Sequence, residues 1–91
     1  MNIGMVIGNV WATRKEDRLN GSKLMVVQQV DPASGASGKS YVAVDCVGAG
    51  IGERVLIVHG SAARAALRNM EIPVDAAIIG ILDNPKGTFG E

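Results

Sequence analysis

The chain has 91 residues, of which 47% are hydrophobic and 20% charged, and its nine basic and nine acidic side chains cancel. This length corresponds to one domain, residues 1–91. Zero net charge and few aromatic residues argue against the basic, aromatic-lined groove of a nucleic-acid-binding protein. The apolar share exceeds what a small monomer comfortably buries, so the composition predicts an oligomer.

The single cysteine, Cys46, cannot form a disulfide within the chain, which is typical of a reducing compartment. The first residues lack the basic and apolar regions of a signal peptide, and no apolar run approaches the length of about 18 residues that a membrane span needs. No closely spaced Cys and His residues could hold a metal such as zinc. We therefore expect a cytoplasmic protein without a metal, a cofactor or a membrane partner.

Strand-like segments follow one another along the chain, rich in β-branched residues and separated by turn signals such as Asn20-Gly21. The glycine-rich stretch 31–39 is expected to be a surface loop, and residues 84–91 an exposed tail. The predicted strands are 3–12, 24–30, 40–47, 54–59 and 76–82.

Before the last strand, residues 60–69 carry the alanines of a short helix. Ser61 is the expected N-cap of this helix, and Asn69 its expected end. This order of elements predicts a mainly β fold, namely a small five-stranded OB-like β-barrel with one short α-helix before the last strand. We expect the barrel to be a partly open Greek key.

The stretch 44–53 reads Val-Asp-Cys-Val-Gly-Ala-Gly-Ile-Gly-Glu and at first suggests a phosphate-binding loop. Such a loop works by opening a helix, whose free N–H groups attract the anion. Residues 54–58 instead form a continuous apolar run that predicts another strand, and no Gly-Lys-Ser/Thr sequence follows the glycines. We therefore do not expect a nucleotide at this loop.

Asp45 and Glu53 flank these glycines, and a tight loop could bring them together as the acid and base of a hydrolase. The alternative is that each carboxylate accepts hydrogen bonds from N–H groups of the loop or of a neighbouring chain. We favour this second role, with Asp45 as a loop brace, because no third polar group nearby suggests a substrate pocket.

The other candidate groups have ordinary structural explanations. Cys46 and His59 could form a nucleophilic pair, but a buried strand cysteine and a strand-end histidine are the commoner explanation. Arg64 and Arg68 lie four residues apart and would share one helix face, where they either bind an anion or a carboxylate of another subunit or face the solvent. Trp11 is expected to be a packing anchor.

Four motifs in this order resemble the EutN/CcmL family, the pentameric vertex proteins of bacterial microcompartment shells. The resemblance runs from about Gly4 to Asp83. The motifs are Gly-Asn-Val-Trp-Ala-Thr-Arg-Lys with Leu-Asn-Gly-Ser-Lys-Leu (8–15 and 19–24), Asp-Cys-Val-Gly-Ala-Gly-Ile-Gly-Glu (45–53), Gly-Ser-Ala-Ala-Arg (60–64) and Pro-Val-Asp-Ala-Ala-Ile-Ile-Gly-Ile-Leu-Asp (73–83).

The resemblance implies a homopentamer that has no catalytic role. The pentamer would cap the vertices of a polyhedral shell in the cytoplasm, meet hexameric microcompartment shell proteins along its rim and close the shell around encapsulated enzymes. By resemblance, Ser61 and Arg64 would lie at a subunit interface at the start of the helix, and Ala62 stands where the family has a second serine. The residues expected at subunit contacts around the central axis are Gly48, Ala49, Gly50, Ile51, Gly52 and Glu53.

Two other function classes stay open from the residues alone. One is a small OB-like binding module for an oligonucleotide or another polymer, which would show salt-sensitive affinity. The other is a small hydrolase that uses Asp45 and Glu53. Chain length and the short tail favour a catabolic shell slightly over a carboxysome, while the conductance of a central pore stays open.

Overall fold

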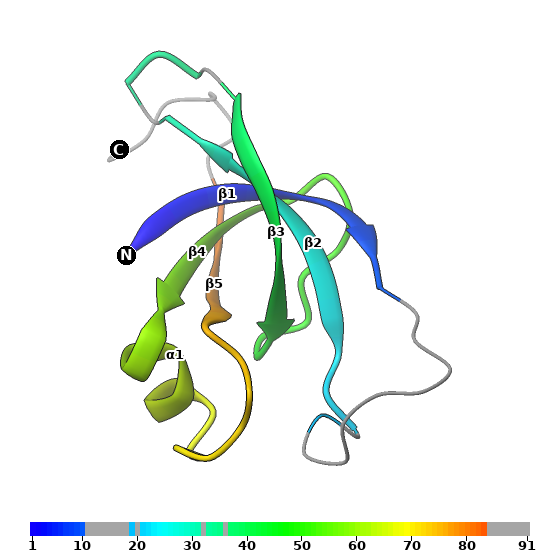
Figure 1. The fold of residues 1–91 in the computed structure, drawn as a ribbon. Helices are drawn as coiled ribbons and strands as arrows, with labels where there is room; N and C mark the ends of the chain where they lie inside the picture. Colours follow the sequence, from blue (N-terminus) through cyan, green and yellow to red (C-terminus); the bar gives the residue numbers. More distant parts are fainter. Residues whose placement is uncertain (11–18, 20, 32, 36, 84–91) are drawn as a thin grey trace.

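The computed structural model describes residues 1–10, 19, 21–31, 33–35 and 37–83 (Figure 1). Three expectations concern residues outside this set. They are the packing role of Trp11, the end of the first strand at residues 11–12 and the exposed tail 84–91. The elements in chain order are β1 (Asn2–Asn9), β2 (Leu24–Val30), β3 (Ser37–Asp45), β4 (Arg54–His59), α1 (Gly60–Ala66) and β5 (Ala76–Leu82).

The five strands form a closed barrel in the order β1-β2-β3-β5-β4. All neighbouring strands are antiparallel except β3 and β5, which run parallel and pair Val44 with Ala77 and Asp45 with Ile78. The prediction of a mainly β, five-stranded OB-like barrel with one short helix before the last strand is confirmed. The expectation of a partly open barrel is wrong, because the β3–β5 pairing closes it.

Alternate residues of the strands fill the barrel, as the two-residue period of a strand requires. The largest fully buried side chains are Met25, Ile57, Ile78, Val6, Val27 and Val55. A second, smaller cluster lies outside the barrel under α1, where Ala63 packs with Val58 and Ala77. The helix lies at the end of β4, beside β5 (Figure 1).

Most strand boundaries agree with the sequence prediction, and the exceptions have physical causes. β3 begins at Ser37 rather than at Ser40, because Ser37 pairs with Val30 of β2 in spite of its glycine-rich surroundings. The N-cap of α1 is His59, so the prediction of Ser61 as the N-cap is wrong. The reason is Gly60, whose φ of 59° turns the chain and whose N–H donates a 2.8 Å hydrogen bond to the Asp75 carbonyl.

The end of the helix also differs from the sequence prediction. α1 ends at Ala66 instead of continuing to Asn69, and Arg68 beyond it adopts a φ of 58°. Left-handed backbone is unusual for a residue other than glycine and interrupts a right-handed helix. The prediction that Arg64 and Arg68 share one helix face is therefore wrong, since Arg68 lies outside the helix.

Gly4 supplies a test of the barrel packing. A Cβ at this position would lie 2.5 Å from Val27 Cγ1 and 2.9 Å from Ile57 Cδ1, both inside the core. We expect Gly4→Ala to lower the free energy of unfolding by about 1–3 kcal/mol, as overpacked cores do. Urea denaturation at a fixed chain concentration measures this change.

Gly8 in the same strand is the matched control. A Cβ there would lie 3.9 Å from Val26 Cβ, an ordinary contact, so Gly8→Ala should leave the free energy of unfolding nearly unchanged. Equal losses in the two variants would contradict the close packing of β1 at Gly4.

Candidate functional site

The glycine-rich loop joins β3 to β4 and is hydrogen-bonded along β1. The Gly52 N–H donates to the Val6 carbonyl at 2.8 Å, and the Val6 N–H donates to the Glu53 carbonyl at 3.0 Å. The loop therefore connects strand to strand, as the sequence predicts, and it does not open a helix. It lacks the helix N-terminus that would attract a phosphate.

The side chain of Asp45 accepts hydrogen bonds from the backbone of the first half of this loop. Its side chain is only 1% exposed. Oδ1 accepts the N–H groups of Val47 and Gly48 at 3.0 and 3.1 Å, and Oδ2 accepts the Ala49 N–H at 2.8 Å. Three backbone N–H groups of the loop therefore donate to one carboxylate. Asp45 is thus bound to the loop backbone, in the arrangement of a structural brace.

Glu53 closes the second half of the loop. Its Oε1 accepts the Gly50 N–H at 2.5 Å, and its own N–H donates to the Gly50 carbonyl at 3.1 Å. Gly48 and Gly52 have φ values of 82° and 90°, a region that side chains rarely adopt. The two carboxylates thus hold successive turns of one loop.

Apolar side chains stand out on the surface around the loop. Ile51 is 62% exposed, and Val47 is exposed as well. Ile7 is exposed next to Val6, the β1 residue to which the loop is hydrogen-bonded. Ala49 between them is fully buried and anchors the loop in the barrel core. We call the exposed set Ile7, Val47 and Ile51 the loop patch, in which Val47 and Ile51 belong to the loop and Ile7 follows Val6, the hydrogen-bonding partner of the loop.

The predicted interface residues of α1 lie on its first two turns. Ser61 is exposed. Arg64 is half-buried, and its Nη1 donates a 3.2 Å hydrogen bond to the Val74 carbonyl in the connection to β5. Arg64 thus ties the helix to this connection within its own chain. A charged contact of Arg64 with another subunit stays a prediction.

Cys46 and His59 do not have the properties of a nucleophilic pair. The expectation of a buried strand cysteine is wrong, because β3 ends at Asp45 and Cys46 lies exposed in the following bend. Partial desolvation, followed by the charge of Asp45, raises the pKa of the Cys46 thiol, which disfavours the reactive thiolate. His59 does end a strand, and its ring centroid lies 5.4 Å from that of Tyr41.

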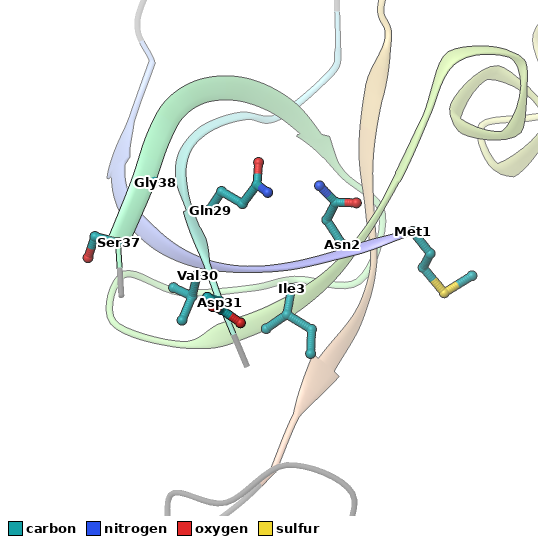
Figure 2. Close-up of a pocket in the computed structure, with 8 residues that line it drawn as sticks. All are labelled: Met1, Asn2, Ile3, Gln29, Val30, Asp31, Ser37 and Gly38. Atoms are coloured by element: carbon teal, nitrogen blue, oxygen red, sulfur yellow. The ribbon is translucent and has the colours of Figure 1, made fainter. Parts of the chain in front are cut away.

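Two cavities lie elsewhere, near the start of β1, and both are lined by Asn2 and Gln29. Figure 2 shows the larger one, of about 540 Å³, between β1, the end of β2 and the start of β3. The second, of about 360 Å³, is also lined by His59 and Asp75. Neither of these two cavities is lined by Asp45 or Glu53.

The described residues contain no group of three His, Cys, Asp or Glu side chains that could hold a metal ion. Within that same part of the chain, no helix has both the length and the apolar character to cross a membrane.

Known proteins are similar to this chain in sequence and in fold. A family model described as "Ethanolamine utilisation protein EutN/carboxysome" matches residues 1–83. The bacterial microcompartment shell vertex protein EutN of Escherichia coli (strain K12) is 41% identical, over 91% of this chain and 87% of that protein. The carboxysome shell vertex protein CcmL of Synechococcus elongatus is 49% identical, over 91% of this chain and 84% of that protein.

A solved structure agrees with these matches. The GrpN pentameric microcompartment shell protein from Rhodospirillum rubrum superimposes with a TM-score of 0.81 at 42% identity, over 92% of this chain and 95% of that chain. With nearly the whole chain matched in sequence and in fold, this protein belongs to the EutN/CcmL family.

Proposed function

We propose that five copies of this chain form a ring that caps a vertex of a bacterial microcompartment shell. The relatives named above are shell vertex proteins, and one of them is pentameric by its description. The observation that carries the proposal for this chain is the glycine-rich loop. Its two carboxylates bind its own backbone, while its apolar side chains face outward.

A closed ring of identical subunits needs two different contact surfaces on each subunit. The loop patch is one candidate. The outer face of β2 and β3 is another, because Val26 lies opposite Val42 in the sheet. Val42 is 46% exposed. Exposed apolar side chains on this face and at the loop supply candidate contact residues for such a ring.

The residues proposed to line the central axis are 48–53. Gly48 and Gly52 have no atom within 4 Å of an added Cβ inside their own chain, so space for a neighbour exists there. Because the side chain of Ala49 is buried in its own barrel, this residue would contribute backbone contacts. Ser61 and Arg64 are proposed to lie at the adjoining interface.

In the proposed shell, the ring meets hexameric shell proteins along its rim, lies in the cytoplasm as part of the shell and has no catalytic role. The binding of Asp45 and Glu53 to loop N–H groups supports a structural role for both carboxylates. Identity to this chain is 41% for the Escherichia coli EutN and ranges from 42% to 49% among the CcmL proteins. Identity thus gives no support to the expectation of a catabolic shell.

Shell proteins produced with and without this chain test the proposal. With the chain present, electron microscopy should show closed polyhedra. Without it, the particles should be open at their corners, because flat hexameric tiles supply no fivefold position, and adding the purified ring should close them. Shells that close equally well without any vertex protein would contradict the proposed role.

A further inference from the structure

Lys23 contacts the glycine-rich loop from another part of the chain. This residue immediately precedes β2. Its Nζ donates a 3.2 Å hydrogen bond to the Ala49 carbonyl and lies 3.4 Å from Asp45 Oδ2. Its own carbonyl accepts the Asp45 N–H at 2.9 Å. Lys23 therefore joins the residue that braces the loop to the residue that anchors it in the core.

The charges explain why a lysine is useful at this point. The Asp45 side chain is almost completely buried, and a buried carboxylate is costly unless it is paired and hydrogen-bonded. The Lys23 side chain is about half exposed, so the ammonium group keeps part of its hydration while it neutralises Asp45. The pair can therefore stabilise the loop without the full desolvation of two ions.

The contacts of Lys23 act on the loop more than on the barrel. The side chains that fill the core come from the strands and from Ala49, and the strand pairings do not involve the lysine side chain. The Ala49 carbonyl, in contrast, lies in the loop between Val47 and Ile51, the two members of the loop patch on either side of it. Loss of the lysine charge should loosen this segment and leave the barrel folded.

We propose that Lys23 is a positioning residue for ring assembly, a role that rests on the proposed function. By holding Asp45 and Ala49, it keeps the loop in the one conformation that a neighbouring subunit can pack against. The entropy of ordering the loop is then lost when the chain folds and not when subunits associate, which is how preorganisation strengthens binding.

Lys23→Met tests this role, because methionine keeps an unbranched side chain and removes the charge and the hydrogen-bond donors. Lys39→Met is the matched control, since the Lys39 side chain makes no hydrogen bond or ion pair within the described part of the chain. Lys23→Arg is the conservative variant. Because arginine keeps the positive charge and the hydrogen-bond donors, this variant should retain most of the ring stability of the unmodified chain. All variants are compared with the unmodified chain.

Native mass spectrometry over a dilution series measures assembly. We expect Lys23→Met to raise the chain concentration at which half of the ring dissociates by about tenfold, because the loss of a charged hydrogen bond in each subunit accumulates around the ring. Hydrogen exchange should become faster at Gly48 and Ala49, while the core strand residue Val27 stays protected. Lys39→Met should change neither measurement.

The possible results distinguish the role of Lys23 from the formation of the ring itself. The mass of the unmodified chain tests the ring itself. A Lys23→Met ring that dissociates within twofold of the unmodified concentration, or with unchanged loop exchange, would overturn the role of Lys23 while the ring stands. Faster exchange at Val27 as well would also overturn it, since Lys23 would then support the barrel as a whole. Recovery in Lys23→Arg supports the proposal.

Discussion

Asp45→Ala is expected to lower the free energy of unfolding by about 2–3 kcal/mol, because a nearly buried carboxylate that accepts several N–H groups is lost. The Ala49 N–H would lose its acceptor in a partly buried position, and Lys23 would lose its ion-pair partner. The melting temperature should fall by about 8–24 °C, a range expected for a domain of this size. Calorimetry at a fixed chain concentration measures the change.

Asp45→Asn is the control for this prediction. An amide keeps one oxygen acceptor but loses the charge and cannot accept hydrogen bonds on both sides. Its loss should therefore be smaller than that of Asp45→Ala. If Asp45→Ala melted within about 2 °C of the unmodified chain, less than half the shift expected for 1 kcal/mol, Asp45 would not brace the loop.

Gly50→Val is expected to abolish the ring and leave the barrel folded. Inside its own chain, a Cβ at Gly50 would meet the Glu53 carboxylate, with Oε1 at 3.2 Å, so the hydrogen bond between Glu53 and the Gly50 N–H must adjust, while no core side chain beyond its chain neighbours lies within 4 Å. Gly50 also lacks the left-handed φ of Gly48 and Gly52. The change is therefore confined to the loop, and a lost ring with a folded barrel would locate the loop at the contact between subunits. Light scattering measures the mass of the assembly, and circular dichroism measures the folded barrel.

Gly48→Ala provides the comparison. Its φ of 82° makes any side chain strained, at a cost of roughly 1–2 kcal/mol, although no atom lies within 4 Å of the added Cβ. This variant should lower the stability of the barrel more than Gly50→Val does. A Gly50→Val chain that still runs as a ring of native size would show that Gly50 does not face a crowded axis.

The strands could be predicted wherever local sequence decides the structure. The segments 24–30, 54–59 and 76–82 are β-branched runs with clear ends, and the structure has them with these bounds. The prediction failed where distant pairing or backbone conformation decides. Ser37 joins β3 because of its partner Val30, and Gly60 turns the chain so that Ser61 does not cap the helix.

In the candidate site, too, contacts between residues close in sequence could be predicted, and contacts between distant residues could not. Asp45 lies within four residues of the N–H groups that it accepts, so a brace at this position could be inferred from the motif. Lys23 is 26 residues from Ala49, and sequence alone does not indicate their contact. Sequence alone likewise does not place Ile7 near the loop. Its neighbour Val6 forms the hydrogen bonds that hold β1 against the loop. The contacts between subunits depend on a second copy of the chain.

Native mass spectrometry of the unmodified chain tests the central claim most directly. The account predicts one dominant species of about 47 kDa, five times the mass of the 9.4 kDa chain. That species should persist at low micromolar concentration, because an apolar interface around a closed ring keeps each subunit bound on two sides. A stable monomer or dimer under the same conditions would contradict the proposed shell vertex.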